Sequence, residues 1–273
     1  MHRSIFHKSL VLLGAASTFA GACANAQLVR VAQLDTSHRQ TGDSVPRESA
    51  RAGYKFKSRE DSVDWARKRA LASRASGFRL IVSLQDAHLW AIVGKDTVLS
   101  APAAVAKGTT LTFGKSSWTF ATPRGMRTVL GKNADPVWQP PEWLYAETAQ
   151  EHDLKLGHIE AGQKIKLSDG RFLSVRDGLV GVLDGGQFAA LPTDEHIVFD
   201  GKLYVPPLGS KNRIVEGELG KYRLNMGEGF LLHGTPYQES IGLAATHGCV
   251  RLRDEDIEWL YDHVPVGTKV YIY

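Results

Sequence analysis

Long hydrophobic runs are missing from this sequence. The longest apolar stretch, Leu10 to Ala20, is shorter than the roughly 20 residues that a transmembrane helix needs. No later segment is a better candidate. We therefore expect no transmembrane helix.

A strong excess of one charge is also missing. The formal net charge is only +4 over 273 residues, and no basic stripe is clustered in one region. Nucleic-acid-binding domains usually carry such a stripe, so the sequence gives no reason to expect a nucleic-acid partner. With 43% hydrophobic and 23% charged residues, the composition is that of an ordinary globular protein.

Cysteine is nearly absent, with Cys23 and Cys249 the only two in the chain. Cys23 lies in an N-terminal leader that we expect to be removed or lipidated, so it is lost as a disulfide partner. Cys249 is then alone, and a lone cysteine in an exported protein is either a buried small hydrophobe or a reactive thiol.

The N-terminus has the pattern of a secretory signal peptide over residues 1–26. Arg3 and Lys8 are followed by the apolar stretch and by the small-residue cleavage site Ala24-Asn25-Ala26. Cleavage would leave 247 residues and, by removing two basic groups, lower the net charge from +4 to +2. We expect an exported protein, periplasmic or associated with the cell wall, with a lipid anchor at Cys23 as the alternative.

Residues 27–77 predict a polar linker followed by one helix. The linker has little hydrophobic periodicity. Residues 59–75 have apolar residues at helical spacing, with Ser58 as the N-cap and Gly77 as the stop.

From Phe78 the sequence predicts short antiparallel strands separated by turns. The prolines of residues 135–144 predict a stiff loop, whose Trp138 and Trp143 either pack on the core or line a substrate wall. Residues 145–207 again resemble strands, and we interpret them as an inserted β-rich segment.

The C-terminal part predicts strands at 222–226 and 229–232, an amphipathic helix at 254–263 and a closing strand at 269–273. Cys249 falls between a strand and this helix. We expect the adjacent helix N-terminus to lower the pKa of the thiol.

Two His-Gly pairs precede Cys249 in the sequence. His233-Gly234 ends a predicted strand, and His247-Gly248 runs directly into Cys249. Acyl transfer by a cysteine needs a thiolate, an imidazole that moves the proton, and donors for the oxyanion. Gly248 allows a close approach of the backbone, so that nearby amides can face a tetrahedral intermediate.

The segment from His233 to Thr246-His247-Gly248-Cys249-Val250-Arg251 resembles the signature of the L,D-transpeptidase (YkuD-like) catalytic domain. Thr122-Pro123-x-Gly125, the 136–141 Pro-Trp loop and residues 212–220 are similar to further family segments. The resemblance spans residues 78–273, with an insertion at about 145–207. It implies a mainly β fold, a mixed β-sheet sandwich or barrel-like domain with few short helices.

The resemblance also implies roles for individual residues. Cys249 is the expected nucleophile, His233 the proton acceptor and donor, and the Gly234 carbonyl the group that orients His233. Thr246, His247, Gly248 and Arg251 are expected around the pocket. For His247 the alternative is a hydrogen-bonded residue that stabilises the turn, and for Arg251 a surface ion pair. No cofactor or metal is implied.

The implied substrate is the peptidoglycan stem peptide. Cys249 would attack a tetrapeptide stem and form a thioester while D-alanine leaves. The amine of a second stem would then attack the thioester, which gives a 3→3 cross-link. Carbapenem-type inhibitors would react with the same thiol. The alternatives are an L,D-carboxypeptidase, a cross-link hydrolase, a transpeptidase that anchors proteins to the wall, and a non-catalytic wall-binding protein.

Overall fold

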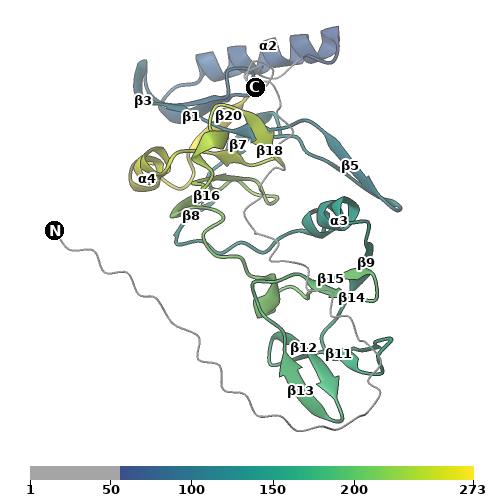
Figure 1. The fold of residues 1–273 in the computed structure, drawn as a ribbon. Coiled ribbons are helices and arrows are strands. Elements are labelled where there is room, and N and C mark those ends of the chain that lie inside the picture. The colour runs from purple at the N-terminus through teal and green to yellow at the C-terminus, as the bar shows by residue number, and fades with distance from the viewer. Residues whose placement is uncertain (1–55) are drawn as a thin grey trace, which may run out of the picture. The chain divides into compact units, whose positions relative to one another are not determined.

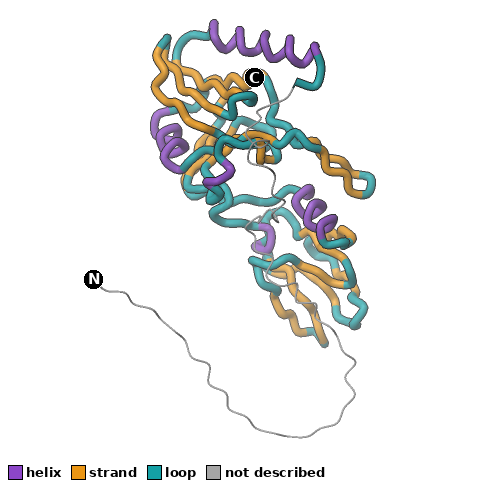
Figure 2. The backbone as a smooth tube through the Cα atoms, turned by 45° about the horizontal axis from the view of Figure 1, so that its top comes forward, coloured by secondary structure: helices purple, strands orange, loops and turns teal. Residues whose placement is uncertain are grey.

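The computed structural model describes residues 56–273, which all belong to the larger of the two units into which the chain divides, residues 31–273. The predicted signal peptide at 1–26 and almost all of the predicted linker lie outside the described residues. The described chain is mainly β, as the sequence predicts, with few helices (Figure 2).

A five-stranded mixed sheet forms one layer of the region that flanks residues 145–207. Its strand order is β3-β2-β1-β20-β7, in which β1 and β20 are parallel neighbours and the other pairs are antiparallel. The bounds are β1 Phe78–Ser83, β2 His88–Val93, β3 Asp96–Pro102, β7 Gly125–Thr128 and β20 Lys269–Ile272. Strand β1 begins at Phe78, where the sequence predicts the first strand, and β20 falls within the predicted closing strand, whereas β7 was not predicted.

A second sheet, of order β19-β17-β16-β8, carries the segment with the two His-Gly pairs. Its strands are β8 Gly131–Ala134, β16 Tyr222–Asn225, β17 Leu231–His233 and β19 Val250–Arg251. Helix α4, Asp254–His263, has the predicted bounds and buries Ile257 and Leu260. These two residues share one hydrophobic core with Leu80 of the first sheet and Leu232 of the second. Apolar packing against the first sheet and α4 therefore holds the second sheet in place.

Short strand pairs complete this region. Strand β4, Val105–Ala106, pairs in parallel with β18, Ala244–Thr246, and β5, Thr110–Phe113, forms a hairpin with β6, Ser116–Thr119.

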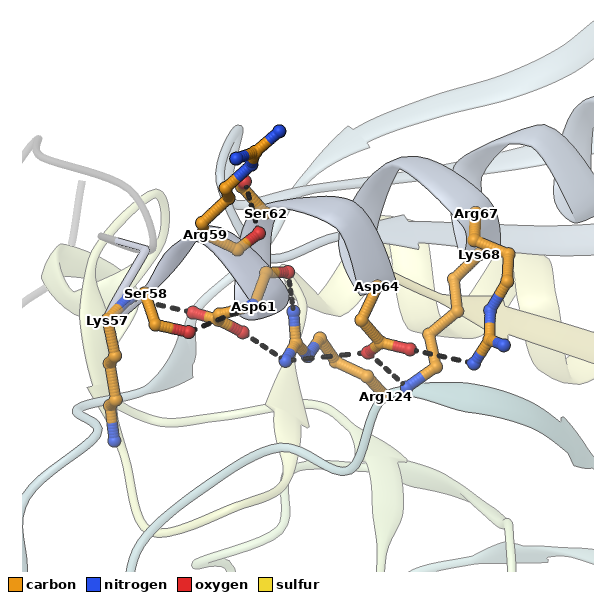
Figure 3. A network of polar contacts seen from close by, with 9 residues as sticks. All are labelled: Lys57, Ser58, Arg59, Asp61, Ser62, Asp64, Arg67, Lys68 and Arg124. Carbon is orange, nitrogen blue, oxygen red and sulfur yellow. Dashed lines mark hydrogen bonds and ion pairs between the residues drawn. The ribbon is translucent and has the colours of Figure 1, made fainter.

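Helix α2, Arg59–Arg74, packs against the first sheet. It begins at the predicted N-cap, where Ser58 Oγ accepts a hydrogen bond from the Asp61 amide at 3.1 Å. The indole of Trp65 meets the ring of Tyr273 edge to face at 5.5 Å. The guanidinium of Arg124 pairs with the carboxylates of Asp61 and Asp64 (Figure 3). Apolar and ionic contacts together thus join the helix to residues distant in the sequence.

The inserted segment begins with a helix that the sequence analysis did not predict. Helix α3, Glu142–Glu151, has Pro141 as its N-cap and includes Trp143, so the predicted proline-rich loop is three residues shorter than expected. Proline removes a backbone donor inside a helix but is compatible with its first turn. The end of α3 lies within residues 145–207, which the sequence predicts as β-rich.

The rest of the segment is β-structured and forms two small sheets (Figure 1). The first has the order β14-β15-β9, with β9 Lys155–His158, β14 Ile197–Phe199 and β15 Lys202–Val205; the second has the order β10-β11-β12-β13, with β10 Lys164–Lys166, β11 Phe172–Arg176, β12 Leu179–Asp184 and β13 Gln187–Ala190. One apolar cluster joins the two sheets and contains Leu173 together with Ile197 and Tyr204. A second cluster packs Leu203 of β15 with Tyr145 of α3.

The ends of the segment are held together by backbone and side-chain contacts. Trp138 and Val215 exchange two backbone hydrogen bonds of 2.8 Å. In the 3₁₀ helix η1, Lys211–Arg213, the Asn212 side chain accepts from the Val180 amide at 2.8 Å, and Arg213 donates to the Pro140 carbonyl at 3.0 Å. Within residues 56–273, no helix is long and apolar enough to cross a membrane.

Candidate functional site

The second sheet places His233 at the end of one strand and Cys249 directly before the neighbouring strand. Strand β17 ends at His233, and β19 starts at the residue after Cys249. The two strands are parallel, with Leu232 opposite Val250 and His233 opposite Arg251, and the Leu252 amide donates to the His233 carbonyl at 2.9 Å. Side chains alternate between faces along a strand, so this register puts Cys249 on the same face as His233 and Arg251.

The His233 imidazole is buried and oriented by a carbonyl. Its side-chain Nδ1 lies 2.6 Å from the Gly234 oxygen, and because a carbonyl only accepts, Nδ1 carries the proton. Burial and, next, the Arg251 charge lower the pKa of His233 to about 3, although the carbonyls of Gly234 and Leu219 act in the opposite direction. The ring is therefore neutral near neutral pH, with its other nitrogen able to accept a proton.

Backbone packing keeps the carbonyl of Gly234 in place. A Cβ on Gly234 would lie 3.1 Å from Asp254 Oδ1 and 3.2 Å from the Cα of Gly220. Gly234 also donates its amide to the Tyr222 carbonyl at 3.1 Å. The group that orients His233 is thus fixed by the neighbouring loop and by the start of α4.

The Cys249 thiol is half-buried, with Sγ 3.8 Å from the Gly229 carbonyl. Burial raises the pKa of the thiol, while the backbone of Leu231 and the charge of Arg251 oppose this rise. The predicted lowering by a helix N-terminus is wrong, because β19 follows Cys249 and helix α4 begins only at Asp254. The resting site therefore pairs a thiol with a neutral imidazole.

The turn before Cys249 is closed by the side chain of Thr246. Its hydroxyl donates to the Cys249 carbonyl at 2.6 Å and accepts from the Gly248 amide at 3.2 Å. Gly248 has a φ of +143°, and a Cβ there would lie 3.1 Å from the Phe230 ring. The Gly248 amide, which the sequence analysis expected near a tetrahedral intermediate, is bonded to Thr246.

The His247 side chain is held by three residues from other parts of the chain. Its ring stacks on Trp143 at 4.1 Å between centroids and meets the edge of Phe120 at 4.4 Å. Its Nε2 lies 3.0 Å from Glu147 Oε2. Trp143, one of the two tryptophans that the sequence left open, therefore packs against the turn that carries the thiol.

The carboxylate of Glu147 binds two basic groups at once. Besides His247, it accepts a hydrogen bond from Lys107 Nζ at 2.8 Å. Burial by itself raises the pKa of Glu147, but the hydrogen bonds and charges of His247 and Lys107 outweigh it and lower the pKa to about 2. Glu147 is thus ionised at neutral pH.

Arg251 lies at the edge of this face. Its guanidinium carbon is 5.6 Å from the centroid of the Tyr237 ring, and the Tyr237 hydroxyl donates to Glu218 at 3.0 Å. Tyr237 is followed by a short 3₁₀ helix, η2, Gln238–Ser240. Among the ion pairs of residues 56–273 none involves Arg251, so the surface ion pair is not observed there.

The part of the chain that the structure describes also contains no group of three or more metal-binding side chains.

Sequence reasoning placed Cys249, His233, Gly234, Thr246, His247, Gly248 and Arg251 around one site, and the strand register and turn bring them together. It left the role of Trp143 open and missed Glu147, Lys107 and Phe120. These four reach the site only through tertiary packing, and the sequence signal available was a helix start at Pro141-Glu142.

Comparison with known proteins gives a consistent family assignment. A family model described as the L,D-transpeptidase catalytic domain, YkuD, matches residues 77–272. The chain is similar to "Probable L,D-transpeptidase ErfK/SrfK" of Salmonella typhimurium, with 37% identity over 87 residues, 27% of this chain and 28% of the relative. It is also similar to "Probable L,D-transpeptidase YbiS" of Escherichia coli strain K12, with 47% identity over 66 residues, 24% of this chain and 20% of the relative. The matched stretches thus span less than a third of each relative's length.

Among solved structures, an L,D-transpeptidase from Xylanimonas cellulosilytica is similar with a TM-score of 0.39 and 17% identity. The similarity covers 76% of this chain and 68% of that chain.

Proposed function

We propose that this chain, which belongs to the L,D-transpeptidase catalytic-domain (YkuD) family, transfers an acyl group of a peptidoglycan stem peptide through a thioester on Cys249, with His233 as proton acceptor and donor. The observation that carries the proposal is the placement of the two residues. His233 ends strand β17, Cys249 directly precedes the parallel strand β19, and the Gly234 carbonyl holds His233 at 2.6 Å.

The first step fits a neutral thiol beside a neutral imidazole. As Sγ of Cys249 attacks the carbonyl carbon of the third stem residue, the thiol proton moves to the free nitrogen of His233. The tetrahedral intermediate then collapses: the bond to D-alanine breaks, and His233 returns the proton to the leaving amine. The low pKa of His233 favours this return, because an imidazolium in that buried place is a strong acid.

The second step reverses the first with a new nucleophile. The side-chain amine of another stem attacks the thioester, His233 takes its proton, and Cys249 leaves as the thiol. The product is a 3→3 cross-link. Water in place of the amine would give carboxypeptidase action, and a protein amine would attach that protein to the wall.

The oxyanion needs a donor beside Cys249. Since the Gly248 amide is bonded to Thr246, we assign this role to the amide of Cys249 itself. Thr246 supports it by binding the Cys249 carbonyl and the Gly248 amide, which fixes the direction of the intervening backbone. Arg251, on the same face, is the proposed partner of a stem carboxylate, because its planar guanidinium suits paired hydrogen bonds.

Export follows from the sequence of residues 1–26, and we propose that the protein acts in the periplasm or at the cell wall. Removal of this leader would leave Cys249 as the only thiol of the mature chain.

Acylation of Cys249 is tested by intact-mass spectrometry after exposure to a carbapenem. The expected result is one covalent adduct on the wild type and none on Cys249→Ala. The His233→Ala variant should remain folded and lose acylation. An adduct that persists on Cys249→Ala would overturn the assignment of the nucleophile, and unimpaired acylation of His233→Ala would overturn that of the base.

The acceptor is identified by incubating the protein with purified tetrapeptide monomers and, separately, dimers, followed by chromatography. New dimers with released D-alanine support the transpeptidase. D-alanine release without dimers would instead identify a carboxypeptidase, and loss of dimers a cross-link hydrolase.

A further inference from the structure

We propose that Glu147 is a positioning residue for acyl transfer, which acts through His247 on the turn that carries Cys249. This inference rests on the proposed function and adds a residue outside the signature segment. It also links helix α3 of the inserted segment to the nucleophile.

The first step is the contact between Glu147 and His247. Their 3.0 Å separation joins residues that are 100 positions apart in the sequence, and both side chains are largely buried. The ionised carboxylate can only accept, so His247 Nε2 is the donor. A hydrogen bond to a charged acceptor in a partly buried place is stronger than one between neutral groups, and it fixes the ring orientation.

The second step is that His247 has little freedom to turn away. Trp143, also on α3, stacks on one face of the ring with an interplanar angle of 18°, and the edge of Phe120 meets it at 84°. One helix therefore supplies both the stacking ring and the hydrogen-bond acceptor. The other side of the carboxylate is held by Lys107.

The third step connects His247 to the proposed oxyanion donor. His247 and Gly248 are the only residues between Thr246 and Cys249, and Gly248 adopts a φ of +143°. Thr246 fixes the turn from within, by its bonds to Gly248 and Cys249. The Thr246 carbonyl accepts from the Lys107 amide at 2.9 Å, so Lys107 also supports the turn through its backbone. Glu147 fixes the same turn from outside, and with it the direction of the Cys249 amide.

The test compares two reactions of the same thiol. Acylation by a carbapenem passes through a tetrahedral intermediate and needs the oxyanion donor, whereas alkylation by iodoacetamide is a direct displacement and needs only the thiol. We expect Glu147→Ala to slow acylation by roughly 100-fold, since small misplacements of catalytic groups cost about that much. Alkylation should change by less than about threefold. Glu147→Gln retains an acceptor for His247 and should recover part of the acylation rate.

A matched control is available on the same helix. Glu142 of α3 also contacts a histidine, His158, at 3.2 Å, but this pair is exposed and His158 lies outside the signature segment. Glu142→Ala should acylate at the wild-type rate. Thermal unfolding of each variant verifies that the comparison is made between folded proteins.

Three outcomes overturn the inference. The first is acylation of Glu147→Ala at the wild-type rate. The second is an equal fall in its alkylation, which would assign the effect to the thiol as a whole. The third is an equal loss of acylation in Glu142→Ala, which would assign the effect to α3 in general. Wild type that fails to acylate would overturn the proposed function as well, whereas the other outcomes leave that function intact.

Discussion

Gly220 packs directly against Gly234, with so little space that a Cβ on Gly220 would lie 2.6 Å from the carbonyl carbon of Gly234. That carbonyl orients His233. Gly220 also has a φ of +65°, a conformation that L side chains rarely adopt. The loop before β16 therefore supports the proposed base through a backbone contact.

Gly220→Ala should damage both stability and acylation. The new methyl group meets backbone, which cannot rotate away, so we expect a loss of about 3 kcal/mol in unfolding free energy. In the protein that remains folded, a displaced Gly234 carbonyl should slow carbapenem acylation at least about tenfold. Chemical denaturation and mass spectrometry measure the two effects. Gly217→Ala is the control for φ alone, because Gly217 has a φ of +77° and no atom near the added Cβ. Wild-type acylation in folded Gly220→Ala would contradict the role of this contact.

Gly248→Ala should affect acylation more than the fold. Its Cβ would meet the Phe230 ring at 3.1 Å, a side chain that can move by a few tenths of an ångström, so we expect a stability loss of about 2 kcal/mol. The turn before Cys249 would shift, and acylation should fall about 100-fold. A crystal structure or mass spectrometry of the variant checks the prediction. Rapid acylation of Gly248→Ala would show that the turn tolerates a side chain.

The low pKa of His233 predicts an unusual pH dependence of acylation. A base with an ordinary histidine pKa of about 6.5 loses activity about tenfold per pH unit below that value. Because His233 is protonated only near its pKa of about 3, the rate constant for acylation should stay nearly level from about pH 8 to about pH 5. Time-resolved mass spectrometry over this range measures it, with circular dichroism to verify folding at each pH. An acid limb near pH 6.5 would contradict the assignment.

Glu147 predicts a pH dependence of stability. Its folded-state pKa of about 2 is below the ordinary value of 4.5, so its ionisation stabilises the fold above pH 4.5, and this contribution is lost as the pH falls towards 2. We expect Glu147→Gln to be less stable than wild type by up to about 3 kcal/mol near neutral pH and equally stable near pH 2. Urea denaturation of both proteins at several pH values measures the difference. A difference that is independent of pH would assign it to packing.

The ion pairs of Arg124 should contribute to stability and not to acylation of Cys249. Its guanidinium joins α2 to the turn before β7 through Asp61 and Asp64 (Figure 3). Arg124→Met should lower the unfolding free energy by about 1–3 kcal/mol, because Asp61 is largely buried, and leave acylation of Cys249 unchanged. Arg67→Ala, which removes an exposed partner of Asp64, should change stability by less than about 0.5 kcal/mol. Equal effects of the two variants would show that burial of the Arg124 pair adds nothing.

Local signals in the sequence were sufficient for much of the fold. Ser58 marks the start of α2, and the spacing of Ile257 and Leu260 predicts the inward face of α4. The residues of the site could be predicted from the sequence for the same reason. His233 and Cys249 lie sixteen positions apart, one at the end of β17 and the other directly before β19, so a short motif contains both.

What the sequence did not reveal depends on distant packing. Helix α3 was missed because Pro140 and Pro141 were taken as loop residues throughout, although proline suits the position before a first turn. The pairing of Glu147 with His247 requires α3 to fold against the turn, which no local pattern encodes. The pKa of Cys249 was predicted in the wrong direction, because burial of the thiol raises it and strand β19 separates the thiol from the start of α4.

The paired backbones of Trp138 and Val215 make the inserted segment a closed loop whose ends are set by the catalytic region. Once the ends of a loop are fixed, each doubling of its length adds only about 0.6 kcal/mol of closure entropy. A change in the length of the part beyond α3 therefore costs little closure entropy. The contacts with the turn before Cys249 come instead from the first helix of the loop, through Trp143 and Glu147 of α3.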